Sequence, residues 1–155
     1  MMYLKDFVIE SNRIEGIQRH DVQEDLMAHE RFLMKGRVTV QDLERFVGTV
    51  APGHVLRTQP GQDVRVGNHI APRGGPDILP ALVDILDRAN QHGRQANIFE
   101  LHRDYETLHP FTDGNGRSGR ALWYWMMVNA RDPMVRLGFL HAWYYQSLAA
   151  TPERV

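Results

Sequence analysis

Cysteine is absent from this chain of 155 residues. Its absence excludes disulfide frameworks, zinc sites built from thiolates and cysteine nucleophiles together. Long apolar runs are missing as well, because the most apolar stretch, residues 121–130, is too short to cross a bilayer. Charged residues such as Lys5 and Asp6 argue against a signal peptide or membrane anchor at the N-terminus. We therefore expect a cytoplasmic protein without a membrane partner.

A basic excess is also missing. Lys and Arg together number 18 and Asp and Glu number 19, which gives a formal net charge of −1. A nucleic-acid-binding surface normally brings a strong excess or a stripe of basic residues, so we expect no nucleic-acid partner. With 43% hydrophobic and 24% charged residues, the composition is typical of one globular domain, which we expect over residues 1–155.

Apolar residues recur at helical spacing through most of the chain. Asp21 followed by Glu24 resembles a capping box, and Thr39 can cap the next helix. Residues 121–130 are apolar all round, which predicts a buried helix at the centre of the fold. Helices are predicted over about 3–14, 21–36, 39–51, 76–89, 96–108, 116–130 and 134–149.

The helical period disappears between Gly53 and Gly75. In that interval, residues 54–58 (HVLRT) and 63–67 (DVRVG) resemble two short strands around the turn QPGQ. We predict a β-hairpin over about 54–70. The expected fold class is therefore all-α with one small β-hairpin.

The stretch HPFTDGNGRSGR, residues 109–120, lies immediately before the central helix. Its glycines allow successive backbone N–H groups to turn toward one point, where the helix dipole also attracts an anion. Arg117 and Arg120 are three residues apart, hence on one helical face, and both are always charged. The sequence therefore predicts a polyphosphate site in which these two arginines face a backbone nest formed by Gly114, Asn115 and Gly116.

Two further side chains of this stretch carry chemistry. Asp113 is poorly suited to a phosphate alone, but it fits if Mg²⁺ bridges its carboxylate and the phosphate oxygens. His109 is the only side chain of the stretch that can accept a proton near neutral pH. The sequence thus predicts a magnesium ligand and a general base beside the phosphate site.

HPFTDGNGR followed by Arg120 resembles the signature of the Fic domain family, in which His and Phe precede Gly-Asn-Gly-Arg and a second Arg. Proteins of that family are all-helical, and most of them transfer AMP from ATP to a hydroxyl of a target protein. The resemblance implies the same reaction here, with ATP and Mg²⁺ and with a target protein that exposes Tyr, Thr or Ser. The implied roles are His109 as base, Asp113 as magnesium ligand, Asn115 with Gly114 and Gly116 as phosphate cradle, Arg117 as clamp on the outer phosphates, Arg120 as partner of the γ-phosphate, and Phe111 as the anchor of the loop in the core.

Two other stretches are similar to parts of the same family. APGHVLRT with VRVGNHIAP resembles the flap, a hairpin that covers the active site and can bind a target segment as an added strand. SNRIEG, residues 11–16, resembles the family's inhibitory motif, in which Ser or Thr precedes Glu by four positions. This second resemblance implies an inhibitory helix over about 3–16, in which Ser11 and Glu15 face the nucleotide site and Glu15 pairs with Arg120.

Several alternatives remain open at this stage. The chain could be a catalytically silent nucleotide-binding module, or a Fic-type enzyme that transfers another nucleotide or removes AMP, because the loop says little about the base. A nucleic-acid-binding domain that uses RSGRALWYW as basic and aromatic contacts is disfavoured, since these aromatic residues fall in the expected core. The sequence indicates neither the target protein nor the oligomeric state.

Overall fold

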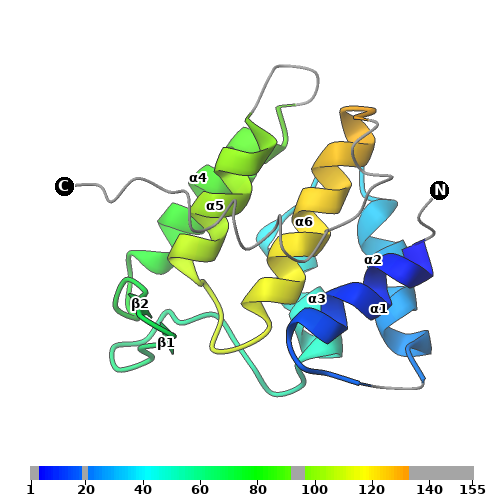
Figure 1. Ribbon diagram of the computed structural model, residues 1–155. Coiled ribbons are helices and arrows are strands. Elements are labelled where there is room, and N and C mark those ends of the chain that lie inside the picture. Colours follow the sequence, from blue (N-terminus) through cyan, green and yellow to red (C-terminus); the bar gives the residue numbers. More distant parts are fainter. Residues whose placement is uncertain (1–3, 19–20, 92–96, 133–155) are drawn as a thin grey trace.

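The structure, a computed structural model, describes residues 4–18, 21–91 and 97–132. The described part is helical with one two-stranded hairpin (Figure 1), which confirms the predicted fold class. The helix expected over 134–149 lies outside the described residues. None of the described helices has the length and apolar character needed to cross a membrane. In chain order the elements are α1 (Leu4–Ile14), α2 (Gln23–Leu33), α3 (Val40–Val50), β1 (Arg65–Val66), β2 (His69–Ile70), α4 (Ile78–Ala89), α5 (Ile98–Leu108) and α6 (Asn115–Asn129).

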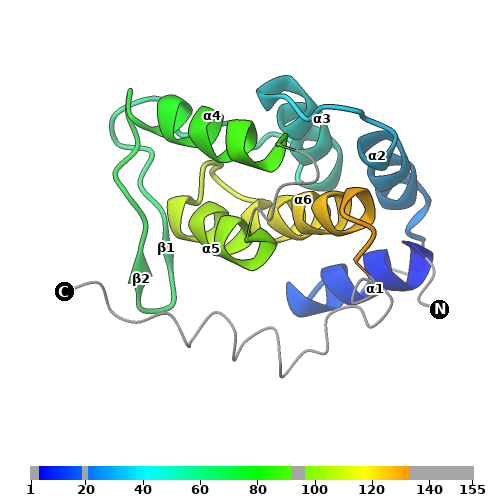
Figure 2. The ribbon, with the colours of Figure 1, turned by 90° about the horizontal axis from the view of Figure 1, so that it is seen from above.

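Helix α6 lies in the middle of the described helices, and the other five surround it (Figure 2). Leu122, Trp123 and Trp125 on α6 each have at most 1% of their surface exposed. The predicted buried central helix is therefore confirmed. Its first turn is polar, and the loop that carries the sequence signature leads directly into this turn.

Two predicted helix caps have different outcomes. Thr39 caps α3 as predicted, because its Oγ1 accepts from the backbone N–H of Asp42 (3.3 Å) and the Asp42 carboxylate accepts from the N–H of Thr39 (2.9 Å). The capping box predicted from Asp21 and Glu24 is wrong. Helix α2 begins at Gln23, so Glu24 is its second residue and is one position too early to reach back to the cap. Asp21 instead accepts from the N–H of Gln23 (3.0 Å) in a local turn.

The hairpin also differs from its predicted register. Its strands are β1 and β2, paired antiparallel across a turn at Gly67, whose φ of +56° favours glycine. Residues 54–58 do not pair with 63–67, because they lie along the loop that precedes α6. In that position Leu56 forms a bridge with Phe111, and the N–H of Thr112 donates to the carbonyl of Val55 (2.9 Å).

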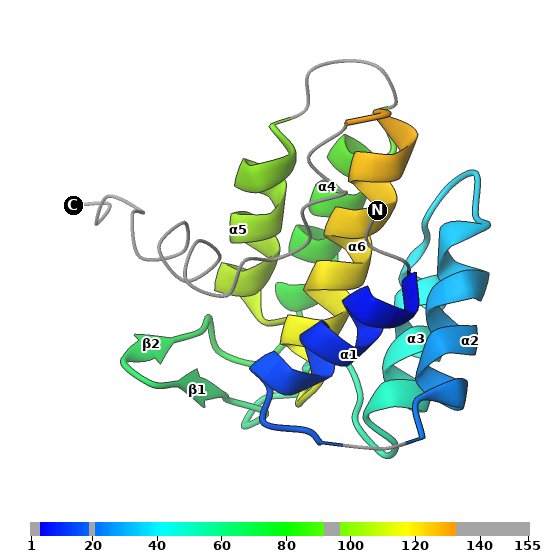
Figure 3. The same ribbon diagram turned by 45° about the vertical axis from the view of Figure 1, so that its right-hand side comes forward.

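Helix α1 lies across the N-terminal half of α6, at the same end of the molecule as the hairpin (Figure 3). Phe7 is fully buried and stacks on Trp123, with ring centroids 6.5 Å apart. Asn12 donates through Nδ2 to the carboxylate of Asp25 on α2 (2.9 Å), and both residues are buried. These contacts fix the C-terminal end of α1, which carries the SNRIEG stretch, beside the first turn of α6.

Candidate active site

The loop between α5 and α6 is held by two anchors. Phe111 is fully buried, in agreement with the expected anchor in the core. The side chain of Asn115 accepts from the N–H of Phe111 and donates to its carbonyl, each at 2.8 Å. The Asn115 side chain thus braces the loop backbone, and a role of Asn115 in the phosphate cradle stays a prediction. Gly114 takes a φ of +80° at the entry to α6, so that the helix begins sharply after Asp113.

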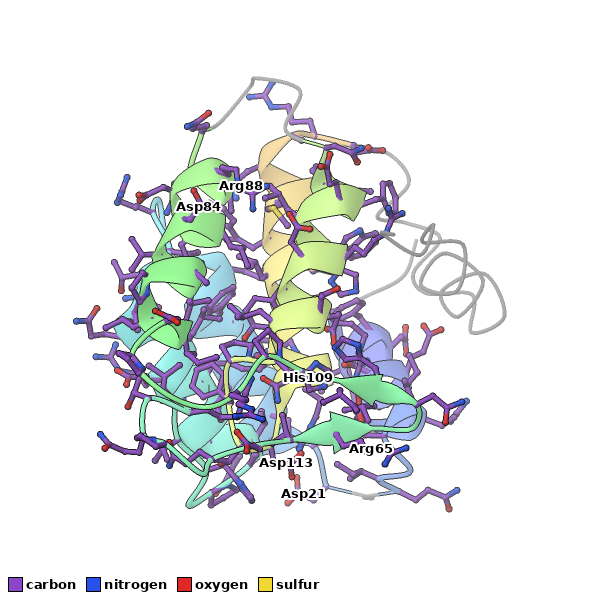
Figure 4. All side chains as sticks on the ribbon, turned by 90° about the vertical axis from the view of Figure 1, so that its left-hand side faces the viewer. Asp21, Arg65, Asp84, Arg88, His109 and Asp113 are labelled. Carbon is purple, nitrogen blue, oxygen red and sulfur yellow. The ribbon has the colours of Figure 1, made fainter. Side chains whose placement is uncertain are left out.

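A cavity of about 370 Å³ opens beside this loop. The end of α1, strand β1 and the first turn of α6 form its walls, and Figure 4 shows His109 and Asp113 beside the hairpin, whose strand β1 carries Arg65. All catalytic, metal and nucleotide residues predicted from the sequence line it, together with Glu15. Its lining consists of Ile14, Glu15, Val64, Arg65, Val66, Glu106, His109, Thr112, Asp113, Gly114, Asn115, Gly116, Arg117 and Arg120.

His109 occupies a constrained position at the end of α5. Its φ is +48°, in the left-handed region that residues other than glycine rarely adopt. Its ring Nδ1 donates to the backbone carbonyl of Glu106, which leaves Nε2 as the nitrogen with a free lone pair in the neutral ring. Burial lowers the pKa of His109 below its ordinary value, and the neighbouring His69 and Arg57 act in the same direction. His109 is therefore neutral, and able to accept a proton, at lower pH than an exposed histidine.

Arg120 projects from the first turns of α6 and is 1% exposed. It donates through Nε to the hydroxyl of Ser11 (2.8 Å), and through Nη2 to the Ser11 carbonyl (3.0 Å) and to the Glu15 carboxylate (2.6 Å). The ion pair expected from the sequence is thus formed, between a buried guanidinium and a carboxylate whose side chain is 37% exposed.

Gly116 makes room for this ion pair. A Cβ at position 116 would overlap the Oε1 of Glu15 and press on the guanidinium of Arg120. The Glu15 carboxylate therefore rests on the first turn of α6, where the positive end of the helix dipole favours an anion. The same position would attract a phosphate group.

Arg117 is the second buried arginine of the cavity, with 5% exposure. Its Nη1 donates to the carbonyl of Val50 at the end of α3, and its Nε is buried without a hydrogen-bond partner among the described residues. Burial lowers the pKa of Arg117, although a guanidinium stays charged across the physiological range. A buried donor without an acceptor in the wall of a cavity fits a site for an anionic ligand.

Asp113 lies at the rim of the cavity, with 61% of its side chain exposed. Its Oδ1 accepts from the N–H of Gly114 (2.7 Å), and its Oδ2 lies 3.8 Å from Nε2 of His54. Within residues 4–18, 21–91 and 97–132, no three His, Asp or Glu side chains converge into a metal site. One exposed carboxylate beside the predicted phosphate site nevertheless fits Mg²⁺, which is commonly held by one or two carboxylates, substrate phosphates and water.

Glu106 lines the cavity and was not singled out from the sequence. Its Oε1 is buried without a hydrogen-bond partner among the described residues, and burial raises the pKa of Glu106 to about 8. The Glu15 charge raises this pKa further, whereas Arg120 opposes the shift. Gly119 is the one residue of the sequence that indicates a neighbour packed closely against α6, because a Cβ there would overlap the Glu106 carboxyl group. Glycine inside a helix indicates such a close approach.

The sequence model of the Fic/DOC family matches residues 23–127. This match runs from the start of α2 nearly to the end of α6, so it contains the hairpin and the whole 109–120 stretch. Helix α1, which carries Ser11, and Glu15 in the turn directly after it both lie before the matched region. No curated protein matches the chain.

Proposed function

Because this chain belongs to the Fic/DOC family, we propose that it is a protein adenylyltransferase. It transfers AMP from ATP, in the presence of Mg²⁺, to a hydroxyl side chain of a target protein. The observation that carries this proposal is one cavity that holds a proton acceptor, two buried arginines and a helix N-terminus. The arginines and the helix N-terminus suit a triphosphate, and the proton acceptor suits attack by a hydroxyl group.

In this reaction the hydroxyl oxygen of the target bonds to the α-phosphorus of ATP. The bond between that phosphorus and the oxygen bridging to the β-phosphate breaks, and pyrophosphate leaves with the electron pair. The hydroxyl proton passes to Nε2 of His109, since Nδ1 is held by the carbonyl of Glu106. Such transfers depend chiefly on positioning and on neutralisation of charge, which the bracing of the loop by Asn115 and Phe111 supports.

The proposed nucleotide contacts come from α6 and the loop before it. Backbone N–H groups at the start of α6, with Gly114 and Gly116, face the phosphates, while Arg117 and Arg120 neutralise their charge. Asp113 is the residue that would hold Mg²⁺, which when bound offsets the negative charge of the phosphates. We place the target segment along the hairpin, where Val66 and Ile70 are 50% and 73% exposed and free to contact a partner.

We further propose that α1 inhibits the reaction. Glu15 and Ser11 together take three hydrogen bonds from Arg120, the guanidinium that the γ-phosphate requires. A carboxylate also lies where the phosphate charge would accumulate. ATP would then bind without its γ-phosphate partner, with the α-phosphate misaligned for attack.

Asp113→Ala is expected to raise the Mg²⁺ concentration needed for half-maximal transfer by roughly tenfold or more, because affinity for hard cations follows the number of charged oxygen ligands. The measurement is a magnesium titration of AMP transfer by variants that also carry Glu15→Gly. Asp77→Ala is the matched control, since Asp77 is exposed and makes no side-chain capping bond at α4. An unchanged magnesium dependence in Asp113→Ala would contradict the metal assignment.

The acid limb of the pH profile is expected to lie below pH 6.5, the approximate value for an ordinary histidine. Transfer needs neutral His109, whose pKa is lowered, so activity persists as the pH falls and is lost only when the ring becomes protonated. Rates of AMP transfer by the Glu15→Gly protein across pH 5–8 give this limb. A limb above the ordinary histidine value would argue against His109 as the base.

The transferred group can be identified by supplying the Glu15→Gly protein and a cell lysate with nucleoside triphosphates labelled at the α-phosphate, one base at a time. Adenylyltransfer predicts label in protein from ATP well above that from the other three nucleotides. Preferential labelling from another nucleoside triphosphate would show that the transferred group is the corresponding nucleoside monophosphate and not AMP. Binding of ATP without any labelling would indicate a nucleotide-binding module instead.

A further inference from the structure

Arg57 is fully buried, although it carries a charge. Its guanidinium makes four hydrogen bonds, and all four acceptors are backbone carbonyl oxygens. No ion pair of Arg57 with a carboxylate is formed within the described part of the chain. Burial lowers the pKa of Arg57, and Asp63 partly offsets this effect. Such a residue holds backbone in place, since each bond to a charged donor is strong and directional.

One side of this guanidinium binds the hairpin. Nη1 donates to the carbonyls of Gln62 (3.0 Å) and Pro72 (2.8 Å), which are the residues where the chain enters and leaves the hairpin arm, 63–71. The backbone of Gly74 lies close to the carbonyl of Gln62 at the same point, so close that a Cβ at position 74 would overlap it. Arg57 therefore joins both ends of the arm to the body of the domain.

The other side binds the end of α5. Nε donates to the carbonyl of His109 (2.6 Å) and Nη2 donates to that of Leu108 (2.8 Å). These carbonyls lie at the negative end of the helix dipole, which stabilises a cation. The backbone N–H of Arg57 also donates to Pro110 (2.9 Å), and its carbonyl accepts from Gly75 (2.9 Å). Arg57 therefore holds the backbone of the proposed base, His109, and of the residues before and after it, Leu108 and Pro110.

We propose that Arg57 is a positioning residue. It ties the two ends of the hairpin arm to His109 and keeps the His109 backbone in its left-handed conformation, which places the imidazole. This inference rests on the proposed function, because it assigns Arg57 to the placement of the general base. One guanidinium then fixes the position of the hairpin, along which the target segment binds, relative to His109, which activates the target hydroxyl. The nucleotide contacts are held separately, through Asn115 and α6.

The test uses Arg57→Lys and Arg57→Gln in the Glu15→Gly protein. Lysine keeps the charge but cannot serve four carbonyls in two directions. We expect kcat for AMP transfer to fall roughly ten- to a hundredfold in both variants, with KM for ATP changed less than about twofold, because the base is misplaced and the phosphate site is intact. In Arg57→Gln the lost charge also moves the acid limb to higher pH, whereas Arg57→Lys leaves it in place.

Arg88→Gln is the control, since Arg88 pairs with Asp84 and Asp104 away from the cavity (Figure 4). It should leave kcat and KM unchanged. An unchanged kcat in a folded Arg57→Lys protein would overturn the proposal, as would a parallel loss of kcat and ATP affinity. Absence of transfer from the Glu15→Gly parent itself would instead count against the proposed function.

Amide hydrogen exchange on the unsubstituted chain tests the same link without activity and without a variant that fails to fold. The amides of Arg57, Gly75 and Thr112 bond across the hairpin base and the loop. If Arg57 holds the hairpin and the loop together, these three amides should become exposed to exchange in the same opening event. Their protection factors should then agree within roughly threefold. Protection of Gly75 lower than that of Arg57 by about tenfold or more would show that the hairpin base opens independently, and would overturn the proposal.

Discussion

Glu15→Gly is expected to convert a nearly silent protein into one that attaches AMP to itself and to its target. The substitution removes the 2.6 Å contact between the Glu15 carboxylate and Arg120, which frees the guanidinium for the γ-phosphate. A hydrogen bond to a charged group contributes about 1.5–3 kcal/mol, and 1.4 kcal/mol is tenfold, so the gain should be roughly ten- to a hundredfold. The mass increment of AMP on the intact protein, followed with time after ATP addition, measures it.

Two further variants show whether the carboxylate itself is responsible. Arg13→Gly introduces a glycine two residues earlier, at an exposed position in the last turn of α1, and it should leave the protein silent. Ser11→Ala removes one of the three hydrogen bonds to Arg120 and should give a smaller gain than Glu15→Gly. Equal activity in wild type and Glu15→Gly would end the inhibitory assignment of α1, and equal gains in Arg13→Gly and Glu15→Gly would attribute inhibition to helix stability alone.

His109→Ala in the Glu15→Gly protein is expected to lower AMP transfer by roughly 10²–10⁴-fold, the usual contribution of a general base. ATP affinity should change little, because the phosphate contacts come from Arg117, Arg120 and the start of α6. Initial rates of transfer, together with ATP binding measured by calorimetry, separate the two effects. Transfer at the parent rate would exclude His109 as the base, and loss of ATP binding in step with transfer would give it a structural role.

The sequence predicted most of the elements, because their signals are local. The apolar run of α6 required burial on all sides, and Thr39 with Asp42 satisfied the geometry of a cap. The stretch SNRIEG ends at residue 16 and HPFTDGNGRSGR begins at residue 109, yet Glu15 and Arg120 meet as the family resemblance implied. The roles of the site residues in catalysis and inhibition remain predictions that the experiments above address.

Other features depended on tertiary contacts that no local pattern reveals. Residues 54–58 have the alternation of a strand, but the loop before α6 offered them a partner that buries Leu56 and Arg57. The strands of the hairpin are consequently residues 65–66 and 69–70, on either side of the turn at Gly67, and not residues 54–58 and 63–67 as predicted. The two hydrogen bonds between the Asn115 side chain and the backbone of Phe111 were likewise not predicted from the sequence. The four hydrogen bonds of the Arg57 side chain could not be predicted either, because their acceptors are backbone carbonyls, which every residue carries.

The central claim is transfer of the α-phosphoryl group with its nucleoside. The most direct test supplies the Glu15→Gly protein with ATP labelled at the α-phosphate, at the γ-phosphate or in the adenine ring, and measures label that stays on protein after denaturation. AMP transfer predicts equal incorporation from the α-phosphate and the adenine ring and none from the γ-phosphate, with incorporation lowered roughly 10²–10⁴-fold when His109→Ala is added. Label from the γ-phosphate alone, or no label from any of the three, would contradict it.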